Sequence, residues 1–289
     1  MKKILLILLM LISEIVIGQS KKNTEYLPKG HLFEPIMLDP LEAQGYASVG
    51  RALNDNVFDL GIYAPFSIGF IKPIARWQTK KNQLREVALD VANFTQFEIF
   101  YDKVLNKARR HIVNSDYKIS LNFNTKIDEE KSYRIRFYHI SSHLGDDYLI
   151  KNGYTSLYAN PVNYEQADFT YSVQKKYFRY YGGIGYGIRP YFKPTEVRKR
   201  GALEAGLFWK SPIKNQKNVQ WIVGIDLKML EQTNFRPGIK TGIGIRVGEE
   251  SKNPFNFIVE YYNGPLPYSK FESEPNAQLI GASFYFNPF

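Results

Sequence analysis

The chain of 289 residues contains no cysteine, four methionines and three tryptophans. Without cysteine there can be neither disulfide bonds nor thiolate metal sites. After residue 17, no stretch approaches the ~20 consecutive apolar residues that a transmembrane helix needs. We therefore expect a mature protein that has no helical anchor and depends on packing and hydrogen bonding for its stability.

The first residues are the exception to this lack of long apolar runs. Two lysines, Lys2 and Lys3, precede an apolar run over residues 4–17, and the small residue Gly18 follows it. A basic start, a short apolar core and a small residue are typical of a signal peptide. Although Glu14 interrupts the run, we predict a signal peptide over residues 1–19 and an exported protein. A retained anchor is the alternative.

Acidic residues are too few to balance the basic ones, and the formal net charge is +10. Because an exported chain does not meet nucleic acid, we expect membrane lipid or lipopolysaccharide as the anionic partner. Solubility alone is an equally good explanation of the charge. The chain is rich in aromatic residues, with 21 tyrosines and 20 phenylalanines. This composition favours strands and supplies the aromatic girdles of a membrane barrel.

Strict alternation of apolar and polar residues dominates the chain from Gly45 onward. In residues 219–229 and 239–248, branched apolar residues alternate almost throughout with glycine and charged residues. Strands of this length suit a membrane barrel, whose tilted strands need ~9–11 residues. A soluble sandwich more often has strands of ~5–6 residues. We predict an all-β fold, an antiparallel transmembrane β-barrel over residues 45–289, preceded by a lead-in over residues 20–44 that contains no strand.

About twelve strands are expected, and connection lengths suggest how they are arranged. The predicted strands are residues 45–52, 57–71, 84–101, 115–126, 131–141, 162–174, 178–189, 201–210, 219–229, 238–248, 255–263 and 277–286. The stretch 45–71 is the weakest part, because Pro65 and Pro73 interrupt it. With both termini in the periplasm, the outer connections are longer than the inner ones, as in bacterial outer-membrane barrels. The aromatic end at Phe289 resembles the signal read by the barrel-assembly machinery, although Pro288 departs from it.

The inward face of this barrel combines positive and negative charges. Both signs occur at similar strength, and glycines fill most other positions. We expect a narrow lumen cross-linked by ion pairs rather than a wide pore. The charged residues predicted to face inward are Glu86, Asp90, Arg134, Arg136, Asp168, Glu204, Asp226, Lys228, Lys240, Arg246 and Glu260.

The strand over residues 131–141 carries the candidate chemistry. His139 and Ser141 share its apolar, lipid-facing side, where polar groups are costly and usually functional. Residues two apart on a strand project side by side, so the imidazole could take the proton of the hydroxyl group. Asn163 or Glu165, on the next strand, would orient the imidazole. A one-residue slip of register would instead turn the pair into ordinary polar lumen lining.

The residues around His139 and Ser141 resemble two kinds of protein. The stretch Arg136-Phe137-Tyr138-His139-Ile140-Ser141-Ser142 is similar to the active-site strand of outer-membrane phospholipase A and of the lipid A deacylase. This resemblance implies a serine-type lipid acyl hydrolase with His139 as base and Ser141 as nucleophile. The stretch from His139 to Asp146, with that from Phe33 to Pro40, also resembles an uncharacterised bacterial family of exported barrels.

Two further interpretations stay open at this point. No cofactor is required, but Asp146 and Asp147 could bind calcium through their carboxylates; a solvated loop is the alternative. The protein could also be a non-enzymatic barrel, either a narrow channel or a structural or lipid-binding protein. Its oligomeric state cannot be read from the sequence.

Overall fold

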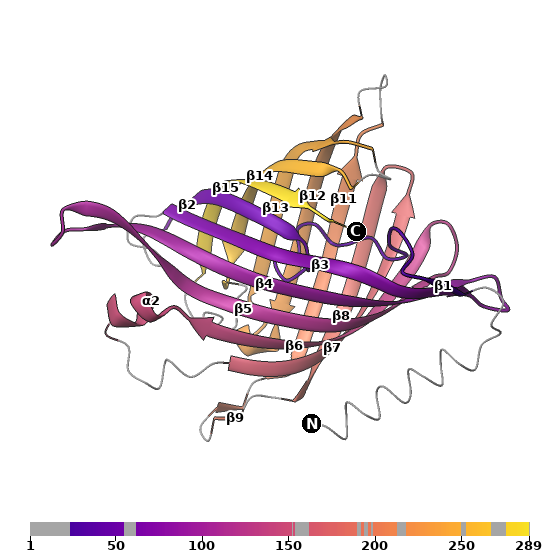
Figure 1. The fold of residues 1–289 in the computed structure, drawn as a ribbon, viewed down its shortest axis with the longest axis horizontal. Coiled ribbons are helices and arrows are strands. Elements are labelled where there is room, and N and C mark those ends of the chain that lie inside the picture. The colour runs from indigo at the N-terminus through magenta and orange to yellow at the C-terminus, as the bar shows by residue number, and fades with distance from the viewer. Residues whose placement is uncertain are drawn as a thin grey trace.

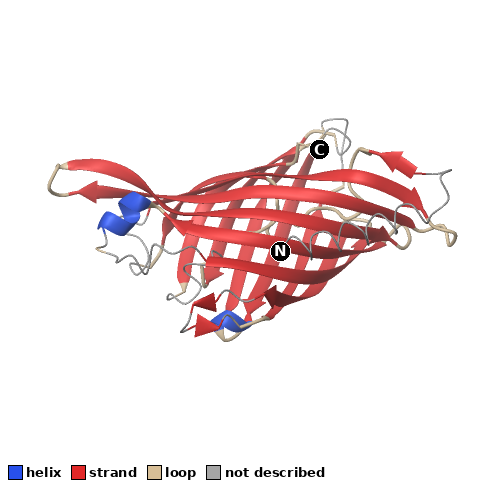
Figure 2. Ribbon diagram, turned by 60° about the horizontal axis from the view of Figure 1, so that its bottom comes forward, coloured by secondary structure: helices blue, strands red, loops and turns tan. Residues whose placement is uncertain are grey.

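The computed structural model describes residues 24–54, 62–151, 153, 162–189, 192–193, 196–197, 199–212, 218–249, 253–266 and 276–288. The predicted signal peptide, residues 1–19, lies outside these residues. Strands make up most of the described chain (Figure 2). None of the helices in the described residues is long and apolar enough to cross a membrane.

Twelve antiparallel strands among the described residues close into a barrel (Figure 1). Each strand pairs with the next along the chain, and the last pairs with the first. This confirms the prediction of an all-β, antiparallel barrel of about twelve strands. The strands are β2 (Gly45–Ala52), β3 (Ile62–Gln78), β4 (Leu84–Asp102), β5 (Lys107–Lys126), β6 (Lys131–Leu144), β7 (Val162–Lys175), β8 (Phe178–Arg189), β11 (Gly201–Lys210), β12 (Val219–Leu230), β13 (Pro237–Val247), β14 (Phe255–Gly264) and β15 (Ala277–Phe286).

The strand boundaries differ from the predicted ones mainly at β3. The sequence predicted a strand over residues 57–71; residues 57–61 lie outside the described residues, and β3 continues through Pro73 to Gln78. The register with β4 shifts just after Pro73. Proline is tolerated here because β2 pairs only with residues 62–67 of β3, so no strand on that side needs the missing N–H group.

The lead-in contains one short strand, so the prediction of a lead-in without strands over residues 20–44 was wrong at this point. β1 (Thr24–Tyr26) pairs with Ala75, Arg76 and Trp77 of β3. It lies along the part of the β3 edge that β2 does not reach. An unpaired edge exposes backbone donors and acceptors, so β1 covers a stretch of β3 that would otherwise be open.

The two ends of the barrel differ in the length of their connections. One end, here called the turn rim, has the connections 79–83, 127–130, 176–177, 211–218 and 248–254. The other end, the loop rim, has the connections 53–61, 103–106, 145–161, 190–200, 231–236 and 265–276. The loop-rim connections are generally longer, as predicted for the outer side. The short helices α2 (Asp146–Lys151) and η1 (Glu231–Thr233) and the two-residue strands β9 (Phe192–Lys193) and β10 (Glu196–Val197) also lie in loop-rim connections.

The two faces of the wall have opposite character. Many outward side chains are apolar and exposed, such as Ile119, Phe137 and Ile243. The inward face carries charged residues, as predicted. Of the charged residues predicted to face inward, those that are buried are Glu86, Asp90, Arg134, Arg136, Asp226, Lys240, Arg246 and Glu260.

The lead-in fills the lumen between these charged walls. Phe33, Ile36 and Leu38 are almost completely buried, with at most 2% of their surface exposed. Leu38 packs in one cluster with residues of four wall strands, Phe208, Ile222, Ile258 and Tyr285. The sequence predicted an ordered lead-in and a narrow lumen, but it did not place the lead-in inside the barrel.

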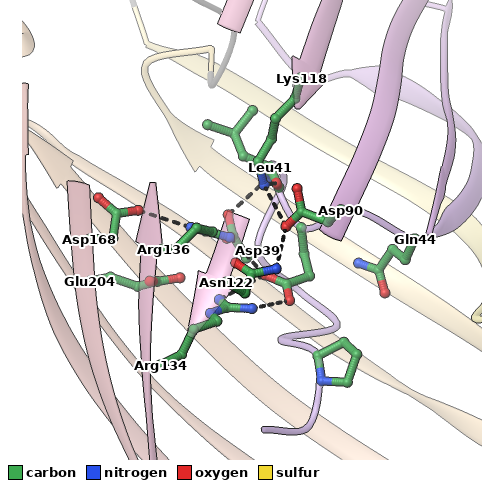
Figure 3. A network of polar contacts seen from close by, with 12 residues as sticks. Asp39, Leu41, Gln44, Asp90, Lys118, Asn122, Arg134, Arg136, Asp168 and Glu204 are labelled. Atoms are coloured by element: carbon green, nitrogen blue, oxygen red, sulfur yellow. Dashed lines mark hydrogen bonds and ion pairs between the residues drawn. The ribbon is translucent and has the colours of Figure 1, made fainter. Parts of the chain in front are cut away.

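Ion pairs tie the lead-in to the wall, and Figure 3 shows the arginines of β6 pointing toward it. Glu42 Oε1 lies 2.6 Å from Nη1 of Arg134, and Glu42 Oε2 lies 3.1 Å from Nη1 of Arg136. Asp39 makes an ion pair with Lys228 of β12 on the other side of the lumen. The predicted cross-links therefore exist, but several of them pass through the lead-in.

Cationic wall side chains also bind backbone carbonyl groups of the lead-in. The Lys118 ammonium donates to the Leu41 carbonyl at 2.8 Å (Figure 3). Arg179 donates to the carbonyls of Pro35 and Glu34, at 2.9 Å and 2.5 Å. A buried carbonyl group needs a hydrogen-bond partner. The wall side chains provide such partners to a segment that has almost no secondary structure of its own.

We predict that Glu42→Ala destabilises the barrel by about 3–5 kcal/mol, because it leaves the buried Arg134 without a carboxylate. Urea unfolding of the detergent-solubilised protein, followed by tryptophan fluorescence, measures this change. The matched control is Lys131→Ala, which removes an ion pair with Asp128 whose side chains are both almost half exposed. Loss of such an exposed pair costs less than ~1 kcal/mol. Equal effects of the two substitutions would contradict this account of the lead-in.

Candidate active site

Strand β6 presents different chemistry on its two faces. Arg134, Arg136 and Tyr138 are buried on the inward face, whereas His139 and Ser141 are partly exposed on the outward face. The faces are those that the alternation predicted. Both residues lie near the loop-rim end of β6, where the strand leads into α2.

Ser141 is hydrogen-bonded to a histidine, but to a different one from that predicted. Its Oγ lies 2.8 Å from Nε2 of His143, and no hydrogen bond joins it to His139 among the described contacts. The sequence predicted a strand that ends at Ser141, with His143 in the loop that follows. Because β6 continues to Leu144, His143 shares the outward face with Ser141. The spacing His139-Ile140-Ser141-Ser142-His143 was the available signal, since it continues the alternation by one step.

The predicted base, His139, is held by the predicted acidic residue. His139 and Glu165 are register partners on β6 and β7, and Nδ1 of the imidazole lies 3.2 Å from Oε1 of the carboxylate. A carboxylate at Nδ1 favours the tautomer in which Nδ1 carries the proton and Nε2 has a free lone pair. This arrangement leaves Nε2 as the ring nitrogen that is free to accept a proton when the imidazole is neutral.

Asn163 lies directly across from Ser141 in the register of β6 and β7. Its amide makes no hydrogen bond to either histidine among the described contacts. Of the two orienting residues predicted from the sequence, the structure thus brings Glu165 to His139 and places Asn163 beside the serine.

Ser141 stands midway between the two histidines along β6. Each histidine is two residues away, which corresponds to about 6.6 Å along a strand. Rotation about the Cα–Cβ bond of Ser141 can therefore turn its hydroxyl group toward either imidazole. In apo structures, catalytic hydrogen bonds are often incomplete and form only with substrate bound.

The outward wall around the serine is apolar toward the turn rim and polar beside the serine. Tyr117 is the register partner of Ser141 on β5, and its ring meets the His143 ring edge-on at 6.0 Å. Next to it, Ser115 accepts a hydrogen bond from Asn93 at 2.7 Å. This polar pair on the outward face was not predicted, because isolated serine and asparagine residues carry no recognisable sequence pattern.

A buried hydrogen-bond network supports the site from the inward side of the wall. Gln96, Asn114, Asp116 and Ser142 are all fully buried. Gln96 donates to Asn114 at 2.6 Å, Asn114 donates to Asp116 at 2.7 Å, and the Ser142 hydroxyl donates to the same carboxylate oxygen. The network joins β4, β5 and β6, so it ties Ser142, the residue that follows Ser141, to the two neighbouring strands.

Asp146 and Asp147, the predicted calcium ligands, are exposed in the first turn of α2. The acidic residues that the described structure brings together lie elsewhere, inside the lumen. Carboxylate oxygens of Asp39, Glu204 and Asp226 lie within 4.8 Å of one another. The Lys228 ammonium makes ion pairs with Asp39 and, at 3.9 Å, with Glu204. The ammonium group of Lys228, a cation of the chain itself, thus lies among these carboxylates.

A closed barrel with an apolar outward wall and a charged, filled lumen defines an outer-membrane type of protein, and solved structures agree. Outer membrane phospholipase A from Escherichia coli, in an active-site mutant, superposes with a TM-score of 0.57 at 9% identity, covering 89% of this chain and 94% of that chain. The calcium-bound dimer of the phospholipase from Salmonella typhi gives a TM-score of 0.55 at 10% identity, covering 85% and 91% of the two chains. At these identities the likeness shows the fold.

The chain belongs to a family described as protein of unknown function (DUF1207), whose model matches residues 13–286. The sequence resemblance to an uncharacterised family is thereby confirmed. No curated protein matches the chain.

We predict that Asp116→Ala destabilises the barrel by about 2–3 kcal/mol, because the buried amide of Asn114 and hydroxyl of Ser142 lose their acceptor. Asp116→Asn is the control, since its amide oxygen can still accept both hydrogen bonds. Denaturant unfolding of both variants in detergent measures the difference. A stability loss as large in the asparagine variant as in the alanine variant would contradict the role given to the network.

Proposed function

We propose that the protein is a bacterial outer-membrane enzyme that hydrolyses acyl esters of the lipids around it. One observation carries the proposal: a serine hydroxyl hydrogen-bonded to an imidazole on the outward wall, beside a second imidazole held by Glu165. Polar groups at the lipid-facing surface of a membrane protein are costly and usually functional. The plain alternative is a set of interfacial polar residues without a catalytic role.

Ser141 is the nucleophile and His139 the general base in the proposed reaction. The Ser141 hydroxyl turns toward His139, and its proton moves to Nε2 as Oγ forms a bond with the ester carbonyl carbon. The carbonyl π pair moves to the oxygen, which becomes an oxyanion. Glu165 stabilises the imidazolium that forms on His139.

The tetrahedral intermediate then collapses with cleavage of the ester C–O bond. The leaving alkoxide takes the proton from His139, which releases a lysolipid and leaves the acyl group on Ser141. Water, activated by the same imidazole, hydrolyses this acyl-enzyme to a free fatty acid and restores the hydroxyl group. Asn163, across from Ser141 in the register, is placed to donate its amide N–H to the oxyanion.

The substrate class follows from the position of the serine on the outward wall. Acyl chains of a phospholipid or of lipid A can lie along the apolar side chains below Ser141, such as Phe137 and Ile119. With the loop rim outside the cell, these would be lipids of the outer leaflet. Every step uses side chains of this chain, and Asp146 and Asp147 remain the proposed ligands if calcium supports the reaction.

We predict that purified wild-type protein releases fatty acid from phospholipid or lipid A in mixed micelles. Ser141→Ala and His139→Ala should each lower turnover at least ~100-fold, because a nucleophile or a general base is lost. Ser132→Ala, at the turn-rim end of the same strand, should retain the reaction. Heat-modifiable gel migration shows whether each variant has folded.

The assay is run with calcium and with a chelator, so that both calcium-dependent and calcium-independent hydrolysis would be detected. The enzyme proposal fails if the wild-type protein releases nothing above background in both conditions. It also fails if the folded Ser141 and His139 variants match the wild type.

A channel is the second function to consider, and the filled lumen argues against it. The lead-in crosses the lumen and is held by Arg134, Arg136 and Lys228. We predict little or no conductance when the protein is added to planar lipid bilayers. Large, stable single-channel steps from the wild-type protein would favour a channel over the hydrolase.

A further inference from the structure

The hairpin of β4 and β5 extends beyond its neighbours at the loop rim. β3 begins at Ile62, opposite Ile99, and β6 ends at Leu144, opposite Asn114. Residues 100–111, here called the finger, therefore have no neighbouring strand on either side among the described residues. In Figures 1 and 2 the finger stands away from the body of the barrel.

The tip of the finger is held by its own hydrogen bonds. The Asp102 carboxylate accepts the backbone N–H groups of Val104 and Leu105, both at 3.0 Å, and pairs with Arg109 at 3.1 Å. The hydroxyl of Tyr101 donates to the side chain of Asn106. The backbone of the turn is thus held in a defined conformation by side chains of the turn itself.

The base of the finger is braced by α2. Glu98 lies 2.9 Å from Nε2 of the buried His111 and 3.7 Å from the Lys151 ammonium of α2. The ring of Tyr148, also in α2, meets the His111 ring edge-on at 5.4 Å. These contacts fix the direction in which the finger leaves the barrel.

The exposed surface of the tip combines apolar and basic side chains. Val104 is 93% exposed and Leu105 is 52% exposed at the very end of the turn. Lys103, Lys107 and Arg110 are exposed around them. A braced turn that holds two apolar side chains in water, surrounded by cations, needs a partner that is apolar inside and anionic at its surface.

We propose that the finger is an anchor for an anionic lipid surface, a role independent of the hydrolase. Val104 and Leu105 enter the apolar layer, while the lysine and arginine stems extend along it and leave their charges at lipid phosphates. The outward wall of β5 next to the finger is also apolar and exposed, at Tyr117 and Ile119. An acidic protein would match the charges but would leave the apolar tip without a comparable environment.

The absence of cysteine makes a direct test possible. Val104→Cys creates the only thiol, which can carry an environment-sensitive fluorophore. The labelled protein is reconstituted in vesicles of phosphatidylcholine alone or mixed with phosphatidylglycerol. We expect a blue shift, and quenching by spin-labelled acyl chains, that are much stronger in the anionic vesicles. A label introduced by Lys81→Cys, in the connection between β3 and β4 at the turn rim, should stay in water in both.

Charge removal then tests the basic residues. Replacing Lys103, Lys107 and Arg110 by glutamine should lower the ratio of inserted to free tip about 100-fold, at about fivefold per charge. The matched control replaces three lysines at the turn rim, Lys80, Lys81 and Lys175, and should leave the 104 label inserted.

The proposal is overturned if the 104 label stays in water in anionic vesicles, or if both triple variants behave alike. A label that becomes buried only when an acidic protein is added would also overturn it, in favour of a protein partner. None of these measurements depends on fatty-acid release, so the finger and the hydrolase stand or fall separately.

Discussion

The ion pairs between Glu42 and the two arginines of β6 are the interaction on which the rest of the structure depends. Arg134 and Arg136 are almost completely buried, and a buried guanidinium group is tolerated only with a charged and hydrogen-bonded partner. The wall alone supplies Asp168 for Arg136, whereas the carboxylate of Arg134 comes from the lead-in. Because side chains alternate along a strand, a β6 whose arginines face the lumen has His139 and Ser141 on its outward face. The filled interior and the candidate active site thus both depend on the alternation of side chains along β6.

Much of the fold could be predicted because a barrel wall has a simple local rule. Each spanning strand separates lipid from an enclosed polar interior, so apolar and polar residues alternate over its whole length. This rule located the twelve strands and assigned Glu260 and Arg246 inward. It also gave the correct outward face for Ser141, whose register partner Asn163 was predicted to lie nearby.

The features that could not be predicted depend on contacts between distant segments. Nothing within residues 27–44 shows that Glu42 meets an arginine 92 positions away. β3 continues through Pro73 because neither β2 nor β1 pairs with it at that residue, which depends on the lengths of its neighbours. The sequence predicted His139 as the partner of Ser141, whereas the structure has His143 there. This difference has a local cause. Strand ends are set by pairing with β5, and that pairing adds the three residues that bring His143 onto the wall.

The pairing of β15 with β2 also has a consequence for folding. The Ser283 and Ser48 side chains, which hydrogen-bond across this seam, are 235 positions apart, and Lys228 and Asp39 are 189 positions apart. Contacts between such distant positions have a high entropic cost before they form, so folding is slow when they dominate. The barrel cannot close until its C-terminal strand has been synthesised and delivered. Until then, the charged inner wall and the lead-in are not enclosed, and a chain of this design must be kept from aggregating before the barrel closes.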